Sequence, residues 1–564
     1  MQVNWRDGNQ IFYLYVLIWS VFGAVQACFT GLHPDEAYYH QFSQCIDWGF
    51  FDHPPMIAVL IRVGSCIFDG VWGLRLGTVV LQPVFWLLLW RLVRTEKVPS
   101  PQQALIMGIL MASLPMMQLY GFITTPDMPL LTFTVLFWLV YRKILGQQGS
   151  DAWNAAWLTL AMTGMAYSKY LGAIQVILAL AAHPRLLRKP VWLIAVGATT
   201  IFLLPHLYWQ YRHDFVSFRF HLEHRSEGIR WDYIWQFLPN QLAVFHPFNL
   251  FALFMLDWRS KQNEDPLYRA MRMSLIGMLV FYGLLSLRGH TEPHWTVSAT
   301  IPMLWLFVRR AEDHVGFRRF IFRFTAPSLV VVVALRLWLF TDSGNRVARL
   351  SRPDHIFTAM ARLADDRPSI FSGSFQEAAL YQFQTGKPSG LVSTAGVRRT
   401  QYELWKRHAE WQQKSVVVFG AEGPQAQWLS IGHRGIGYLI SDHLQSPELL
   451  HIQQISIQDG THPDSLQIDV WVKNPINDVM DRHHADFPFR WVLCTENRES
   501  KSTDTLPARC LPEPIRFEPH KTSQIEFGIH RSDVPKGPIM VGLQTIFGLQ
   551  FPDDPNDQNM AVAK

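Results

Sequence analysis

Long apolar segments recur along the first 340 residues, and they constrain the fold of this chain more than any other feature. Each is about 15–20 residues long, and about 20 apolar residues cross the hydrocarbon core of a bilayer as a helix. After residue 340 the chain reads instead as a water-soluble protein. We therefore expect a polytopic α-helical membrane domain with about eleven transmembrane helices. The expected spans are 11–30, 72–93, 104–122, 127–145, 153–168, 169–183, 191–210, 238–257, 271–287, 295–309 and 319–340.

The composition agrees with a membrane protein. Charged residues make up 17% of the 564 residues and hydrophobic residues 49%, whereas a soluble domain carries about 25% charged residues. The net charge of +5 is small for this length, and most of the excess lies in short loops between apolar segments. The charge therefore indicates no nucleic-acid partner. The five cysteines lack the paired spacing of a cysteine zinc site.

The basic loops predict one orientation in the membrane. If the N-terminus is cytoplasmic and about eleven helices cross the bilayer, every loop rich in Arg and Lys falls on the cytoplasmic side. The loop after the first span, two later loops and everything beyond residue 341 then face the extracytoplasmic side. The basic loops lie at 91–97, 142–143, 185–189, 259–272 and 309–319, and the two later outer loops at 211–237 and 288–294.

The soluble part has two halves, so three domains are expected, at 1–345, 346–445 and 446–564. In the second domain, helical and strand-like runs alternate, which predicts a small α/β unit. In the third, runs such as SLQIDVWV and SQIEFGI alternate between apolar and polar residues, which predicts a β-sandwich-like extracytoplasmic domain. Cys494 and Cys510 lie in this third domain, where a disulfide and two free thiols are both open alternatives.

The loop after the first expected span is crowded with ionisable and aromatic residues. It reads GLHPDEAYYHQFSQCIDWGFFDHPPM from Gly31 to Met56. Tyr38, Phe42 and Ile46 recur at helical spacing, which predicts a short amphipathic helix in the membrane interface. After two prolines, the apolar run 56–68 predicts a second helix at the membrane surface.

Ionisable groups gather on the predicted outer face, where such groups are costly at a membrane and usually functional. A carboxylate there can take a proton from an acceptor hydroxyl or amine. Positive charges can hold a departing lipid phosphate. The pattern therefore fits transfer of a group from a lipid phosphate to an acceptor. The residues on this face are Asp35, Glu36, Asp127, Lys169, Arg212, Arg288, Glu292 and His294.

Six motifs, in their order along residues 30–410, resemble those of bacterial GT-C class glycosyltransferases. These enzymes belong to the protein-mannosyltransferase-like superfamily, which includes the lipid A aminoarabinose transferases. Agreement across many loops is more specific than any single motif. The motifs are HPDEAYYHQFSQCIDWGFFDHPPM, TPDMPL, YSKY, RHDFVSFRF, EPHW and RRTQYELW.

The resemblance implies an activity and assigns roles. Such enzymes take a sugar from a polyprenyl-phosphate carrier, usually with inversion, on the outer side of the membrane, here expected to be the bacterial inner membrane. Asp35 matches the acid held to be the catalytic base, Glu36 is its usual neighbour, and Asp127 matches a second acid. Lys169 resembles a residue that contacts the carrier phosphate. Further substrate contacts are expected from His53, Arg212, Arg288, Glu292, His294 and Arg399.

The resemblance leaves the substrates open. The DEAYY form of the first loop departs from that of the aminoarabinose enzymes, so neither that sugar nor its acceptor follows. The partners implied are a polyprenyl-phosphate sugar, membrane lipids, and a lipid, glycan or protein acceptor. No cofactor is certain, and a divalent metal held by His, Asp and Glu in these loops is an open alternative.

Structural roles for the same residues also stay open. Asp35, Glu36 and Asp127 can each cap a helix, because an acid near a helix start accepts bonds from free backbone N–H groups. Lys169 can extend its ammonium to the interface without a ligand. The histidines His53 and His294 can brace loops, and the Arg398–Arg399 pair can be solvated.

Other protein classes share part of the pattern. A lipid or glycan transporter or flippase would also have many spans and buried charges, but inverted repeats would favour it, and we see none in the sequence. A lipid-linked glycan ligase or polymerase would use a longer donor on the same scaffold. A receptor without activity would retain the β-rich tail as a glycan-binding domain.

Overall fold

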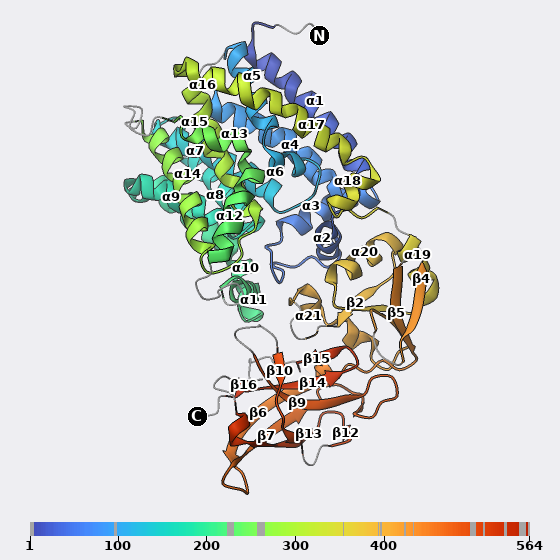
Figure 1. Ribbon diagram of the computed structural model, residues 1–564. Helices are drawn as coiled ribbons and strands as arrows, with labels where there is room; N and C mark the ends of the chain where they lie inside the picture. The colour runs from blue at the N-terminus through green and yellow to red at the C-terminus, as the bar shows by residue number, and fades with distance from the viewer. Residues whose placement is uncertain are drawn as a thin grey trace. The chain divides into compact units, whose positions relative to one another are not determined.

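The computed structural model describes residues 5–94, 99–222, 231–256, 265–352, 355–392, 394, 398–421, 425–431, 434–496, 503–510, 514–534, 539–551 and 560–561. The chain divides into two compact units, Met1–Arg352 and Pro353–Lys564. The first unit is helical and the second contains the sheets (Figure 1). A helical membrane domain followed by a β-rich region is the predicted fold class, which is confirmed.

Helices account for nearly all of the regular structure that is described in the first unit. Its first half contains α1 (Gly8–Phe29), α2 (Pro34–Gln44), α3 (Met56–Ser65), α4 (Gly70–Val93), α5 (Pro101–Ala112), α6 (Pro115–Leu119), α7 (Asp127–Leu145), α8 (Asp151–Ser168) and α9 (Gly172–Ala182). Its second half contains η1 (Pro184–Arg188), α10 (Pro190–Arg212), α11 (Val216–Leu222), α12 (Trp231–Phe245), α13 (Pro247–Leu253), α14 (Pro266–Leu285), η3 (Pro293–Ala299), α15 (Thr300–Asp313), α16 (Val315–Phe320), η4 (Ile321–Thr325), α17 (Ala326–Trp338) and α18 (Asp342–Val347).

Among the described residues, five helical stretches are long and apolar enough to cross a membrane: α1, α4, α7, α10 and the continuous stretch Val315–Trp338. Several other expected spans are interrupted. Segment 104–122 is split by Pro115 into α5 and α6, and 238–257 is split at His246, before Pro247, into α12 and α13. Proline lacks the N–H group and its ring clashes with the previous turn, which favours the end of a helix just before it. The number of spans therefore stays a prediction.

Tryptophans fill the interior of the bundle, where five of them are almost completely buried: Trp86, Trp90, Trp138, Trp192 and Trp305. They belong to one continuous apolar core that includes residues from α1 to η4. Other apolar side chains of α1, α10 and α17 are exposed, as expected of residues that face lipid.

Two short helices follow α1, as the first loop predicts. Proline and a capping box start α2, in which the His33 side chain accepts from the backbone and Glu36 bonds back to His33 N. Pro55 precedes α3. One detail differs, because Ile46 lies beyond the end of α2 and is 50% exposed. Ile46 matches the helical spacing in the sequence, but the helix ends at its C-cap residue Cys45, before Ile46.

The second unit opens with a mixed five-stranded sheet, in the order β2-β1-β3-β5-β4. Strands β2, β1 and β3 are parallel, and the others pair antiparallel. Helix α20 connects β1 with β2, as parallel strands require a crossover. The elements are α19 (His355–Ala364), β1 (Ser369–Ser372), α20 (Phe375–Thr385), β2 (Ser389–Val392), α21 (Gln401–Trp405), η5 (Arg407–Trp411), β3 (Val416–Phe419), β4 (Gln427–Ile431), β5 (Arg434–Ser441) and η6 (Pro447–Leu449).

The remaining strands form antiparallel sheets with a common apolar core. One sheet has the order β11-β13-β7-β6, and a second has the order β10-β9-β14-β15 with β16 beside β14. In a third, two-stranded sheet, β12 pairs with β8. In β7, Ile468, Val470 and Val472 alternate into the core, and Ile525 of β13 pairs with Val470. The strands are β6 (His451–Asp459), β7 (Ser465–Lys473), β8 (Met480–Asp481), β9 (Phe489–Glu496), β10 (Thr503–Thr505), β11 (Arg509–Cys510), β12 (Arg516–Phe517), β13 (Thr522–His530), β14 (Ile539–Thr545), β15 (Gly548–Gln550) and β16 (Met560–Ala561), with η7 (Arg531–Asp533) after β13.

The two cysteines of this region are free thiols, so the disulfide alternative is wrong for this structure. Cys494 lies on β9 and Cys510 on β11, which belong to different sheets. The Cys494 thiol is buried and donates to Met540 O at 3.4 Å. Burial raises the pKa of Cys494 to about 12 and that of Cys510 to about 11.

Candidate active site

Glu36 is the most tightly held of the predicted acids. It is fully buried, and Arg75 of α4, also fully buried, donates to both of its oxygens, from Nε to Oε1 at 2.8 Å and from Nη2 to Oε2 at 2.6 Å. His33 N donates to Oε2 at 2.9 Å and Thr124 N to Oε1 at 2.8 Å. Four donors therefore occupy this carboxylate, which joins α2, α4 and the segment before α7.

Arg75 extends the same connection to the end of α1. Its other N–H groups donate to the carbonyls of Ala27, Thr30 and Gly31 at 2.8, 3.2 and 2.8 Å. These carbonyls belong to the last turn of α1 and the residues after it. A buried guanidinium with all these acceptors is well satisfied, as a charge in an apolar bundle must be.

Asp35, the neighbour of Glu36, has the opposite environment. Its side chain is 38% exposed, and its Oδ2 lies 3.8 Å from Nδ1 of His33. Its backbone N donates to the same His33 nitrogen at 3.2 Å. Because the Glu36 cluster fixes the backbone on which it sits, Asp35 presents an accessible carboxylate from a rigid position.

Asp127 and Lys169 form a second buried pair. Lys169 Nζ donates to Asp127 Oδ1 at 2.8 Å, and the two side chains are only 7% and 4% exposed. Asp127 is the first residue of α7, while Lys169 lies in the extended break between α8 and α9, with φ −164° and ψ 135°. The break lets the Lys169 side chain reach an acid 42 residues earlier in the chain.

Tyr120 links these groups to the first loop and to the loop before η3. It lies close enough to Asp127, Tyr39 and Glu292 to interact electrostatically with all three. Tyr39 of α2 in turn bonds to Nε2 of His53 at 3.2 Å. Glu292 also pairs with His290, at 3.5 Å between Oε1 and Nε2.

Hydrogen bonds hold the first loop, between α1 and α3, against α10 and α11. Trp209 Nε1 donates to Asp47 Oδ2 at 2.8 Å, and the His206 ring nitrogen Nδ1 bonds to Trp48 O at 2.6 Å. Ser217 Oγ donates to Phe50 O at 3.0 Å. The loop that leads to His53 is therefore anchored along its length.

Tyr170 joins this anchored loop to the buried ion pair, because it directly follows Lys169. Its hydroxyl bonds to His206 Nε2 at 3.2 Å and accepts from Gln210 Nε2 at 2.9 Å. It also interacts electrostatically with Asp52 of the first loop. The first loop, α10 and the α8–α9 break thus form one connected wall of the site.

Comparisons with known proteins show which families and folds this chain resembles. Residues 52–209 match the family model described as dolichyl-phosphate-mannose-protein mannosyltransferase. The lipid A galacturonosyltransferase RgtD of Rhizobium johnstonii is 26% identical over 298 residues, an alignment that covers 49% of this chain and 61% of that protein.

The solved structures of ArnT from Cupriavidus metallidurans share the fold. The apo structure has a TM-score of 0.56 at 16% identity and covers 76% of this chain and 97% of that one. The structure bound to undecaprenyl phosphate has a TM-score of 0.54 at 16% identity and covers 75% and 97%. Both comparisons show that this chain has the ArnT fold.

One group of predicted site residues lies close together within the first unit. Asp35 and Glu36 are adjacent on α2, and Asp127 is bonded to Lys169. His53 is bonded to Tyr39, and the charges of Tyr39, Asp127 and Glu292 act on Tyr120. Arg212 is exposed at the end of α10, Arg288 is exposed after α14, and His294 is partly buried in η3. Arg399 lies in the second unit, exposed just before α21.

Sequence reasoning missed the residues that surround the candidate site residues. Arg75 carried a signal, because it is a charge inside the apolar segment 72–93, and such charges are rarely without a role. Tyr120 and Tyr170 carried none, since a tyrosine near a span is ordinarily an interface anchor. Within the described residues, no three or more His, Cys, Asp or Glu side chains are grouped to hold a metal ion.

Proposed function

We propose that this protein is a membrane glycosyltransferase that transfers a hexosyl or pentosyl group from a polyprenyl-phosphate carrier to a lipid acceptor of the lipid A class. The GT-C fold supports the enzyme class. The activity for which the relative RgtD is named supports the acceptor, and the undecaprenyl phosphate bound to ArnT supports the carrier. We also propose that the site and the second unit are extracytoplasmic, at a bacterial inner membrane.

One observation carries the proposal. The Asp35 carboxylate is partly exposed and held on a rigid backbone. The carboxylate of its neighbour Glu36 already accepts four hydrogen bonds, so it is not available as a base. Thr124, which donates to that second carboxylate, lies three residues before the buried Asp127–Lys169 pair. The arrangement thus has an accessible base and a cation in the same wall, which is what transfer from a phosphate carrier requires.

In the proposed reaction, Asp35 takes the proton of the acceptor hydroxyl as that oxygen attacks the anomeric carbon of the sugar. The bond between this carbon and the phosphate oxygen breaks on the opposite face, so the configuration inverts. The electron pair leaves with polyprenyl phosphate, and Lys169 with Arg212 stabilises its charge. Phosphate is already a good leaving group, so no acid need protonate it.

The remaining site residues have proposed positioning and binding roles. Glu36 orients the first loop through Arg75, and Asp127 holds the ammonium of Lys169. His53 is oriented by Tyr39. The other proposed substrate contacts are Arg288, Glu292, His294 and Arg399.

The test is sugar transfer in membranes from radiolabelled polyprenyl-phosphate sugars. We expect Asp35→Asn to lower the rate about 10²–10⁴-fold, because this is the usual contribution of a general base. Asp69→Asn is the matched control, since Asp69 is an exposed acid whose side chain makes no cap hydrogen bond at the start of α4.

Three outcomes are informative. Loss in Asp35→Asn with normal transfer by Asp69→Asn supports both the class and the base. Equal transfer by wild type and Asp35→Asn would keep the class and refute the base. If wild type accepts none of the polyprenyl-phosphate donors, the proposed function is wrong.

A further inference from the structure

Tyr120 lies at a junction of three helix ends in the first unit. It is the C-cap residue of α6, Asp127 is the first residue of α7, and Glu292 is the N-cap residue of η3. Helices α6 and α7 both pack against η3. The charges of Asp127 and Glu292 act on the Tyr120 hydroxyl. The packing therefore brings one tyrosine hydroxyl near two carboxylates from different segments.

The first loop adds a fourth side to this junction. Tyr39 of α2 also interacts electrostatically with Tyr120, and the Tyr39 hydroxyl bonds to Nε2 of His53 at 3.2 Å. Thr124, in the segment between α6 and α7, donates its backbone N–H to Glu36 of the same α2 at 2.8 Å. This bond holds the segment after Tyr120 against α2. Tyr120 therefore adjoins candidate site residues of the first loop as well.

The Tyr120 hydroxyl makes no hydrogen bond to the part of the chain that the structure describes. Only 5% of the residue is exposed, and its ring belongs to the apolar core of the bundle. The hydroxyl oxygen itself is not enclosed, unlike other buried oxygens that lack a partner. A hydroxyl withdrawn from bulk water costs free energy until it finds a partner. A polar group that enters the site can supply that partner.

Tyr282 of α14 provides an internal comparison. The charge of Asp127 acts on its hydroxyl too, and this hydroxyl also has no hydrogen-bond partner among the described residues. The Tyr282 oxygen is completely enclosed, however, so a ligand cannot reach it while the helices keep this packing. The two tyrosines therefore share the influence of Asp127 and differ in access.

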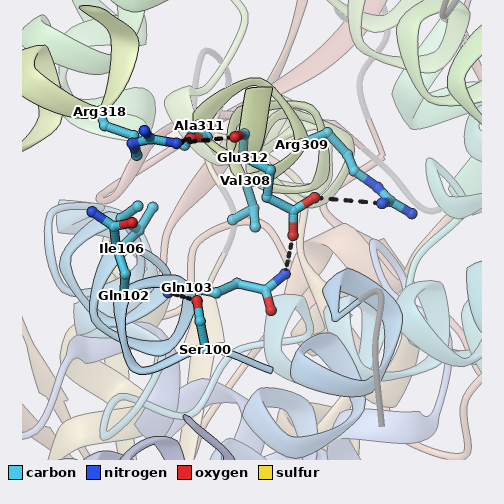
Figure 2. Close-up of a pocket in the computed structure, with 9 residues that line it drawn as sticks. All are labelled: Ser100, Gln102, Gln103, Ile106, Val308, Arg309, Ala311, Glu312 and Arg318. Carbon is cyan, nitrogen blue, oxygen red and sulfur yellow. Dashed lines mark hydrogen bonds and ion pairs between the residues drawn. The ribbon is translucent and has the colours of Figure 1, made fainter. Parts of the chain in front are cut away.

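The pocket between α5, α15 and α16 shows the opposite situation (Figure 2). There Glu312 accepts from Gln103 and pairs with Arg309 at 3.5 Å, and Arg318 donates to two backbone carbonyls at 3.0 and 2.9 Å. Each of these charged side chains is bound by the protein itself. The Tyr120 hydroxyl, in contrast, is a polar group at the candidate site that still lacks a bond.

The surrounding charges decide which ligand group fits beside Tyr120. Lys169 lies 2.8 Å from Asp127, and His290 lies 3.5 Å from Glu292. A phosphate at Tyr120 would lie near two carboxylates that repel it, and the ammonium of Lys169 offsets only one of them. A sugar hydroxyl suits the position better, because it can donate to a carboxylate and accept from the tyrosine O–H.

We propose that the Tyr120 hydroxyl contacts a sugar hydroxyl of a substrate and contributes to its selection. The inference rests on the proposed glycosyl transfer and adds a substrate-contacting residue to it. Both the transferred sugar and a sugar headgroup of the acceptor carry such hydroxyls. The chemistry of the contact is the same in both cases, so the measurement has to separate the two sources.

The experiment compares Tyr120→Phe with the matched control Tyr282→Phe in the purified full chain in detergent. It measures Kd for a polyprenyl-phosphate sugar, Kd for polyprenyl phosphate without a sugar, and KM for a lipid A-class acceptor. We expect Tyr120→Phe to weaken binding of the sugar-bearing carrier, or to raise KM for the acceptor, by about three- to tenfold, which corresponds to one hydrogen bond. The value that changes identifies the source. Binding of the sugar-free carrier, the melting temperature and all values for Tyr282→Phe should stay unchanged.

The other outcomes overturn the proposal. Equal weakening of both carriers would assign the Tyr120 hydroxyl to the phosphate, and an equal loss in Tyr282→Phe would show an effect of packing beside Asp127. Unchanged Kd and KM in Tyr120→Phe, with normal transfer by wild type, would refute this contact and leave the proposed function standing. If wild type binds no polyprenyl-phosphate sugar, the proposed function is wrong and the contact is wrong with it.

Discussion

At the scale of single residues, two neighbouring acids differ in what surrounds them. Asp35 and Glu36 have the same functional group, and both follow the first span. Arg75 pairs with buried Glu36, whereas the side chain of Asp35 is partly exposed. Burial and pairing therefore support the proposal that Asp35 acts as the base and that Glu36 has a positioning role.

We expect Glu36→Gln to lower the free energy of unfolding by about 3–5 kcal/mol, because it leaves the buried Arg75 guanidinium without its counter-charge. Arg75→Met should cost a similar amount for the converse reason. Chemical denaturation in detergent micelles measures both. The double variant Glu36→Gln/Arg75→Met should cost less than the sum of the two single variants. Strictly additive losses would contradict a direct pair.

At the scale of elements, the first outer loop is shaped by its packing on α10. The Trp209 ring covers Gly49, so a Cβ atom at that position would lie 2.5 Å from ring atom Cε3. The bonds from Trp209 to Asp47 and from His206 to Trp48 O flank the same point. Glycine is required here because the ring and the backbone approach too closely for any side chain.

Gly49→Ala should therefore displace the loop and lower kcat/KM for sugar transfer by about tenfold or more, since small misplacements of positioned groups are costly in catalysis. Gly197→Ala is the matched control, because a Cβ atom at Gly197 of α10 meets nothing within 4 Å. The measurement is kcat/KM for sugar transfer by Gly49→Ala and by Gly197→Ala, each compared with wild type. Unchanged kcat/KM in Gly49→Ala would show that the loop position does not matter for the reaction.

At the scale of the whole molecule, the cysteines report both orientation and packing. Cys45 is exposed in the first outer loop, and we propose that this loop is extracytoplasmic. Cys494 is buried in the second unit, where burial raises its pKa to about 12. At pH 8 it is thus almost entirely the unreactive thiol, and the thiolate forms only as the pH approaches that value.

We expect a membrane-impermeant maleimide at pH 8 to modify Cys45 in intact cells and to leave Cys494 unmodified until the protein is unfolded. Peptide mass spectrometry measures both sites. A cysteine placed by Arg185→Cys in η1 should react only after the membrane is opened. Labelling of that cysteine in intact cells would reverse the proposed topology, and rapid labelling of native Cys494 would contradict its burial.

The sequence by itself determined the class of molecule. Hydropathy and motif order are local properties, so they indicated membrane helices, a β-rich C-terminal region and the GT-C superfamily before any contact was known. They also predicted Asp35, Asp127 and Lys169 as site residues. Helix α2 was predicted, although Ile46 lies outside it because periodicity cannot show where a chain leaves a helix.

The tertiary structure decided which of these residues act together. Glu36 with Arg75, and Asp127 with Lys169, are paired across 39 and 42 residues. Cys494 and Cys510 were placed in different sheets. Such pairings depend on which segments pack against each other, and no local pattern encodes that. A buried charge needs a partner, and only the packing of distant segments shows which residue supplies it.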